Sequence, residues 1–204
     1  MARGNFKIDS ALQIQAKPSM MLPESETEAM EHEHEAMEHD KSVEDAPQAF
    51  RAQLRALYNT YTELTAALAG DDFETARGSL PKIKSALSGM DASSLPEGQR
   101  ETWNSAEKSM QNALDSMEKA EAIEGLRREL PAITADLAKT IEVYGIAQGA
   151  PVYRAHCPMA FEDKGADWLQ PDTAIRNPYY GSMMLECGEI TGRLDEAQEG
   201  PAHE

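Results

Sequence analysis

Six candidate donors for a soft metal ion gather near the C-terminal end of this 204-residue chain. They form two groups at opposite ends of segment 155–189, which also holds both cysteines of the chain. The first group is His156, Cys157 and Met159, and the second is Met183, Met184 and Cys187. Thiolate and thioether sulfurs select monovalent copper and similar soft ions over hard cations. Because the residues between the groups include several Gly and Pro, the chain can fold back and bring both groups to one ion.

Two interpretations of the cysteines are open on the residues alone. Two thiolates with one or two thioethers suit Cu(I) or Ag(I), and with His156 added the same set could also hold Zn(II). Alternatively, Cys157 and Cys187 form a disulfide, which is worth about 3–4 kcal/mol for a loop of this length. The methionines would then be core filler.

A second set of candidate donors lies in an acidic segment. Residues 24–45 carry ten acidic residues against one lysine, and such a composition cannot offset the entropy of ordering by burial. We therefore expect a disordered acidic Met/His linker over 23–45. Its candidate ligands are Met30, His32, His34, Met37 and His39. His-rich tracts bind metal at low structural cost, so the segment could act as a low-affinity collector or as a solvated acidic spacer.

Composition limits the partners of the chain. Its formal charge of −17 at pH 7 argues against nucleic acid and anionic membranes. No run of eighteen apolar residues occurs, so we expect no direct membrane insertion. The N-terminus lacks a signal-peptide pattern, which fits either a cytoplasmic protein or a piece whose export signal lies upstream.

The sequence does not indicate an enzyme. It contains no nucleotide-binding glycine loop and no HExxH motif. His156 adjoins Cys157, but neighbouring side chains of an extended strand point opposite ways, so His156 is poorly placed to activate the thiol.

The elements that must position the donors are mainly helical. Apolar residues recur at spacings of three and four through four stretches between 46 and 146, each bounded by turn residues. Four amphipathic helices joined by short turns predict an antiparallel four-helix bundle. Pro81 and Pro131 fall at equivalent points of the second and fourth helices, which is typical of a duplicated hairpin.

The regions on either side of the helices differ from them in kind. Residues 1–22 contain one alternating segment that reads as a strand without its partners. Residues 147–192 are rich in Pro, Gly, Tyr and Trp, so we expect an irregular extension that carries the metal site, followed by a tail over 193–204. The expected fold is mainly α, a bundle with an irregular Cys/Met-containing C-terminal extension.

Four short elements of the extension resemble a known family. They are Cys157–Ala160, Gly165–Gln170, Asn177–Tyr179 and Met184–Gly188. The same elements, in this order, occur in the C-terminal domain of unassigned function that is often fused to periplasmic adaptor subunits (membrane fusion proteins) of copper/silver RND efflux pumps. The N-terminal segment GNFKIDS is similar to the closing strand of the adaptor's membrane-proximal β-domain.

The resemblance implies a function and a compartment. The chain would be the C-terminal portion of an adaptor, exported to the periplasm by an upstream signal, that captures Cu(I) or Ag(I) and delivers it to an RND efflux pump. The first-choice ligands are Cys157, Met159, Met184 and Cys187, with Met183 and His156 as alternates. The alternative is a disulfide-stapled helical interaction module that docks pump components without binding metal.

Overall fold

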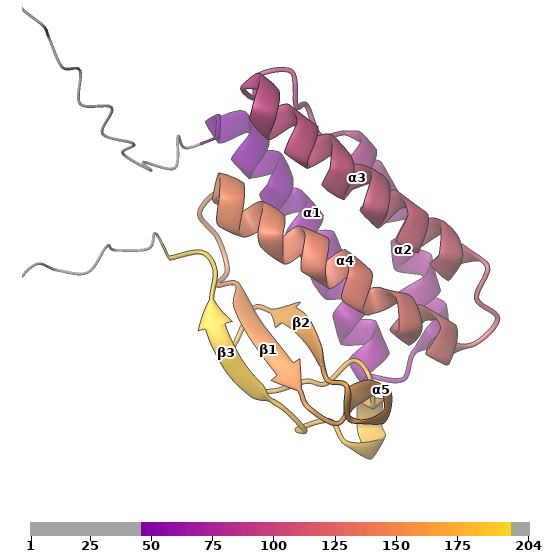
Figure 1. The fold of residues 1–204 in the computed structure, drawn as a ribbon. Coiled ribbons are helices and arrows are strands. Elements are labelled where there is room, and N and C mark those ends of the chain that lie inside the picture. The colour runs from indigo at the N-terminus through magenta and orange to yellow at the C-terminus, as the bar shows by residue number, and fades with distance from the viewer. Residues whose placement is uncertain (1–45, 197–204) are drawn as a thin grey trace, which may run out of the picture. The chain divides into compact units, whose positions relative to one another are not determined.

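The computed structural model describes residues 46–196 of the chain. The strand predicted over 1–22 and the acidic linker of 23–45, with its five candidate ligands, fall outside the described residues. Within them the protein is mainly helical, as the sequence predicts, with four long helices followed by a small antiparallel sheet (Figure 1). None of the described helices is long and apolar enough to cross a membrane.

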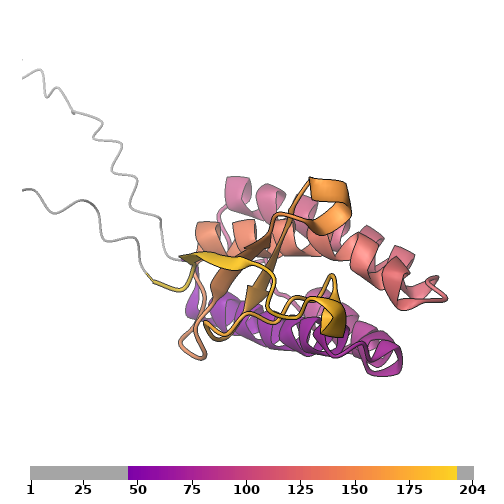
Figure 2. The ribbon, with the colours of Figure 1, turned by 90° about the horizontal axis from the view of Figure 1, so that it is seen from below.

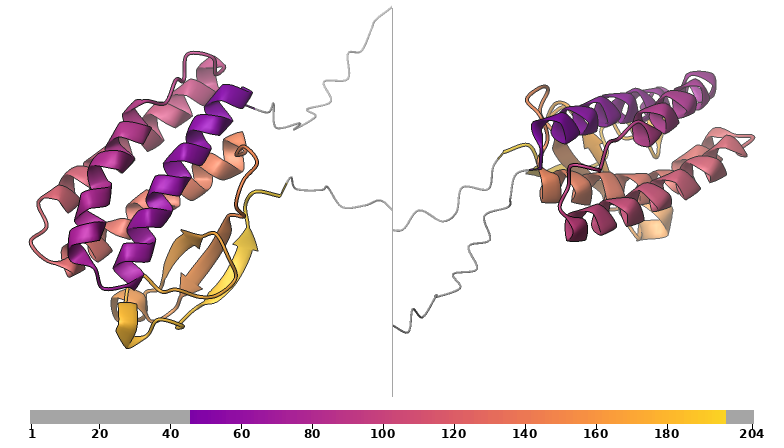
Figure 3. Two further views of the ribbon diagram at one scale, coloured as in Figure 1. Left: turned by 180° about the vertical axis from the view of Figure 1, so that it is seen from behind. Right: turned by 90° about the horizontal axis from the view of Figure 1, so that it is seen from above.

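The four long helices follow the predicted apolar pattern. They are α1 (Gln48–Ala69), α2 (Phe73–Ser88), α3 (Glu97–Glu118) and α4 (Ile123–Tyr144). Asp72 caps α2, because its carboxylate accepts a hydrogen bond from the Thr75 amide at 2.9 Å. Gly145 ends α4 with a φ of 67°, a conformation that favours glycine. Helix α1 packs against α2, and α3 packs against α4 (Figure 3).

A cluster of aromatic rings holds three of these helices together. The ring of Phe50 in α1 meets Trp103 of α3 at 5.3 Å and Tyr144 of α4 at 5.2 Å, both edge to face. All three side chains are buried. Edge-to-face pairs of this kind stabilise a core beyond their buried area.

The C-terminal part forms a regular sheet, so the prediction of an irregular extension was wrong. The sheet has three antiparallel strands in the order β2-β1-β3, namely β1 (Tyr153–Cys157), β2 (Ala166–Gln170) and β3 (Glu189–Arg193). Two short turns complete the region, α5 (Ala160–Asp163) and η1 (Gly181–Met183). The strands are only five residues long, and β2 is buried on both faces, which removes from it the alternation that marks a strand in the sequence.

The β2 edge of the sheet packs against α1 and α4 (Figure 2). The buried hydroxyl of Tyr61 accepts a hydrogen bond from the Leu169 amide at 3.2 Å and bonds the Thr134 hydroxyl at 2.7 Å. The Tyr179 hydroxyl donates to the Asp167 carbonyl on the same edge. Burial raises the pKa of Tyr61 to about 12, so its hydroxyl stays neutral. The hydroxyls of these two tyrosines are hydrogen-bond partners for backbone groups on the outer edge of β2, and Tyr61 thereby joins the sheet to the helices.

Two further hydrogen bonds join the residue before β1 to the residues that follow β3. The Leu194 amide donates to the Val152 carbonyl at 2.8 Å, and the Val152 amide donates to the Asp195 carboxylate at 2.8 Å. The sheet region therefore continues past residue 192, to Asp195, into the segment expected to be a tail.

Candidate metal centre

The two cysteines meet on one side of the sheet. Cys157 ends β1 and is fully buried, whereas Cys187 lies just before β3 and is half-buried. Their sulfur atoms are 3.8 Å apart, and both cysteines are free thiols. A disulfide requires about 2.05 Å between sulfurs. Two sulfurs held at about 2.3 Å from one tetrahedral ion lie about 3.8 Å from each other.

Asn177 fixes the loop that brings Cys187 to this place. Its side-chain amide donates to the Cys187 carbonyl at 2.7 Å, and its backbone amide donates to the Leu185 carbonyl at 2.7 Å. Its side-chain oxygen accepts a hydrogen bond from the Tyr179 amide at 2.8 Å. Asn177 is fully buried, and all these bonds are local to the loop. The sequence pointed to this residue only as part of an element that resembles the adaptor-linked domain.

Gly188 allows the loop to lie directly on the sheet. Its φ is 136°, and a Cβ atom there would stand 2.7 Å from the His156 carbonyl oxygen and 2.8 Å from the Trp168 ring. Both distances are shorter than any normal carbon contact, so a side chain would push the loop away from β1. The glycine thus sets the close approach that brings Cys187 to Cys157.

Two of the three methionines lie closer to solvent than the thiols do. Met183 is 80% exposed and Met159 is 44% exposed, while Met184 is half-buried. The Cys187 amide donates to the Met184 carbonyl at 3.1 Å, which closes a turn carrying one thiol and one thioether. Met159 stands two residues after Cys157 in the other half of the site. The backbone therefore places one thioether-bearing residue close in sequence to each thiol.

A hydrogen bond joins the two halves of the site. The Tyr180 hydroxyl donates to the Met159 carbonyl at 2.6 Å. Between Met159 and β2, Phe161, Glu162 and Asp163 all have left-handed backbones, with φ of 54°, 61° and 63°. Consecutive left-handed residues other than glycine cost free energy, and such strain is common at functional sites.

His156 is not brought to the thiols. Successive strand residues alternate between faces, so its ring lies on the opposite face of β1 from Cys157. There Nδ1 lies 2.6 Å from a carboxylate oxygen of Asp167, in a groove of about 650 Å³ that α4 also lines. The structure therefore does not support His156 as a ligand shared with the cysteines.

The cysteine pair is not joined by a third common metal ligand in the described part of the chain. Within residues 46–196, no group of three or more His, Cys, Asp or Glu side chains could hold a metal. Two thiolates with added thioethers would suit Cu(I) or Ag(I) better than Zn(II). Partial burial, with the neighbouring Cys157 adding to it, raises the pKa of the Cys187 thiol, so a bound ion must displace a proton there.

The loop that carries the second group of donors is fastened to the helices by an ion pair that the sequence did not indicate. Arg127 of α4 donates to the Pro178 carbonyl at 2.8 Å, to the Leu68 carbonyl at 2.9 Å and to Asp71 at 2.6 Å. The other carboxylate oxygen of Asp71 accepts a hydrogen bond from the Ser182 amide at 2.8 Å. We name Asp71 and Arg127 together the loop clamp. Its two members are 56 residues apart, so no local pattern reveals the pair.

The clamp predicts a specific dependence of stability on pH. Hydrogen bonds from Ser182 and then Arg127 lower the pKa of Asp71 to about 2, below the 3.8 of a free carboxyl. Because the folded-state pKa is the lower one, the stabilisation is complete above about pH 4 and is lost as the pH falls toward 2. We expect Asp71→Asn to be less stable than the wild type at pH 7 and the difference to shrink below pH 3. Urea unfolding across this range measures it, and a difference independent of pH would contradict the prediction.

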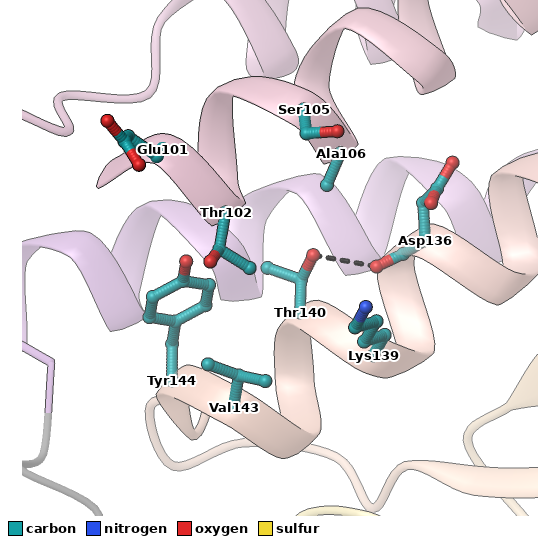
Figure 4. A pocket seen from close by; sticks show the side chains of 9 residues that line it. All are labelled: Glu101, Thr102, Ser105, Ala106, Asp136, Lys139, Thr140, Val143 and Tyr144. Atoms are coloured by element: carbon teal, nitrogen blue, oxygen red, sulfur yellow. Dashed lines mark hydrogen bonds between the residues drawn. The ribbon is translucent and has the colours of Figure 1, made fainter. Parts of the chain in front are cut away.

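A second hollow, between α3 and α4, does not show comparable chemistry (Figure 4). Its volume is about 390 Å³, and its lining includes Glu101 and Asp136 but no Cys, His or Met. The Thr140 hydroxyl in its wall donates to the Asp136 carbonyl at 2.6 Å, as is common inside helices. We therefore take the cysteine pair as the candidate site.

The comparison with known proteins gives a family match over the helical part of the chain. Residues 57–149 match the model of a family described as a protein of unknown function (DUF3347). The match covers somewhat less than half of the chain, from within α1 to the connection after α4, and stops before Cys157. No curated protein matches the chain. No solved structure matches it either.

Proposed function

We propose that this protein binds Cu(I) or Ag(I) through Cys157 and Cys187, with Met184 and Met159 completing the shell. The observation that carries the proposal is the 3.8 Å separation of two free thiol sulfurs. This separation is close to that of two thiolates on one tetrahedral ion. In this proposal the protein has no enzymatic activity, and the metal is its cargo.

The biological setting belongs to the same proposal. The four ordered elements of residues 157–188 resemble the domain fused to periplasmic adaptors of copper/silver RND efflux pumps, so the ion would be captured in the periplasm and delivered to such a pump. The partners would then be the pump and its adaptor components. Met30, His32, His34, Met37 and His39 would collect ions at low affinity.

The helices would serve as the scaffold of the site. We propose that α1–α4 form an antiparallel bundle, which is supported by the contacts α1 makes with α2 and α4 and those α3 makes with α2 and α4. The connection between α1 and α2 is only three residues long, Gly70 to Asp72, which suits two neighbouring helices that run in opposite directions. Such a bundle offers a rigid surface for the β2 edge.

The direct test is a Cu(I) titration of the fully reduced protein under anaerobic conditions, in competition with a chromogenic chelator. We expect one ion to bind tightly per chain and both thiols to become unreactive toward a thiol reagent. Ag(I) should behave alike, and Zn(II) should bind more weakly. Thiols that stay equally reactive in the presence of Cu(I) would overturn the proposal.

The rival function is a disulfide-stapled interaction module, and the same 3.8 Å separation gives it a physical basis because the thiols lie close enough to be oxidised. Thiol counting on protein purified without reductant separates the two. A quantitative disulfide that persists when Cu(I) is added would favour the interaction module.

A further inference from the structure

Residues 181–184, which we name the methionine turn, depend on contacts from outside the turn for their position. Met183 is 80% exposed, so its side chain contributes little packing that could hold the turn. Within the turn, the Met184 amide donates to the Gly181 carbonyl at 3.2 Å, and the next turn joins Met184 to Cys187. Displacement of Gly181 and its neighbours would therefore be passed along the backbone to the donors.

The loop clamp supplies these contacts from the helices. Asp71 accepts the hydrogen bond of the Ser182 amide inside the turn, and Arg127 donates to the Pro178 carbonyl just before it. Both bonds are 2.8 Å long and involve a charged side chain, which makes them stronger than neutral ones. Gly181 lies between the two attachment points.

Further hydrogen bonds to α1 hold both members of the clamp. The Arg127 side chain is only 12% exposed, and it also donates to the Leu68 carbonyl at the C-terminal end of α1, where a positive charge is favourable. Asp71 has a φ of 57° in the short connection between α1 and α2, where its own amide donates to the Leu68 carbonyl at 3.2 Å. The position of the carboxylate is thus set by the helices.

Gly181 shows how closely the carboxylate approaches the turn. A Cβ atom at this residue would lie 2.0 Å from a carboxylate oxygen of Asp71 and 2.6 Å from a guanidinium nitrogen of Arg127. A side chain here would have to displace the side chains of the clamp, and the φ of 58° also favours glycine. The turn and the clamp are therefore matched in shape as well as in hydrogen bonding.

We propose that Asp71 and Arg127 are positioning residues that hold the methionine turn at the metal centre. The proposal rests on the proposed function, since it assigns these residues to the binding of the same soft ion. Neither residue touches the ion; each acts through the backbone of the turn. The clamp would keep the thioether of Met184 beside the cysteine pair before the ion arrives.

The test compares two neighbouring variants. Asp71→Gly removes the carboxylate without strain, because glycine accepts the left-handed backbone. Asp72→Ala is the matched control, since Asp72 caps α2 through Thr75 and has no recorded bond to the methionine turn. We expect Cu(I) affinity, measured with a competing chelator, to fall about tenfold in Asp71→Gly relative to the control, which is the lower end of the range for losing a group that orients a metal ligand, because Asp71 acts only through the backbone. Asp71→Asn, which keeps one acceptor and tolerates this backbone, should recover part of the loss.

A spectroscopic measurement separates positioning from a general loss of stability. X-ray absorption counts the sulfur neighbours of bound Cu(I), and we expect the count to fall toward the two thiolates in Asp71→Gly but to stay unchanged in Asp72→Ala. Equal affinities and equal sulfur counts in the two variants would overturn the positioning role while leaving the proposed function intact. A wild-type protein that binds no Cu(I) would overturn both.

Discussion

Replacing both Cys157 and Cys187 with serine is expected to weaken Cu(I) binding at least about a thousandfold, equivalent to about 4 kcal/mol. The reason is the donor set: serine is a hard oxygen donor, and only thioethers would be left to hold a soft ion. Each single variant should lose most of this affinity too, because one thiolate cannot bridge the two halves of the site. Competition with a chromogenic chelator under anaerobic conditions measures the change.

A matched control tests whether the loss is specific to the two cysteines. Met110→Leu changes another sulfur-containing residue that is buried in α3, away from the sheet, and should leave Cu(I) affinity unchanged. Affinity that is unaltered in the double serine variant would move the binding site to the histidines and methionines of residues 30–39.

Replacing Trp168 with alanine should destabilise the protein by about 3–5 kcal/mol, as for other large buried aromatic residues. Trp168 is fully buried, packs edge to face on Tyr179 with ring centres 6.1 Å apart, and donates from its indole to Gln170 at 2.9 Å. Its loss would leave a cavity beneath the loop that contains Gly188, which lies directly on the sheet. Trp168→Phe keeps a ring in place and should cost less. Urea unfolding followed by circular dichroism measures both.

The two tryptophans also test whether helices and sheet unfold together. Trp103 lies in the helical core and Trp168 in the sheet, so Trp168→Phe and Trp103→Phe each leave one fluorescent probe. We expect fluorescence and circular dichroism to give the same unfolding midpoint within each single-tryptophan variant, because Tyr61 and the loop clamp join the two parts. A fluorescence transition in Trp103→Phe that precedes the loss of helical signal would show that the sheet unfolds by itself.

The helical part of the fold could be predicted from the sequence because its signals are local. The apolar spacing of three and four marks all four helices, and residues such as Asp72 and Gly145 mark where they start and stop. Helices are built from contacts between near neighbours in the chain, so periodicity and caps carry most of the information. How the helices assemble depends on longer-range contacts, which periodicity only suggests.

The sheet could not be predicted in the same way. Its strands are five residues long, and β2 is buried on both faces between α4 and the covering loop, which removes the alternation that identifies a strand. Its stability depends on Tyr61, which is 108 residues away from its partner Leu169. Contacts between residues so far apart in the chain leave no local pattern in a single sequence.

The candidate site shows the same division. The residue types alone left two interpretations of the cysteines open, a soft-metal centre and a disulfide, and only the resemblance to the adaptor-linked domain favoured the metal. Only the tertiary structure decided that the thiols face each other at 3.8 Å and that the His156 ring meets Asp167. Strand register determines which side chains share a face, and the register of short strands is set by what packs on them. The loop clamp likewise exists only because α1 and α4 meet in space beside the methionine turn.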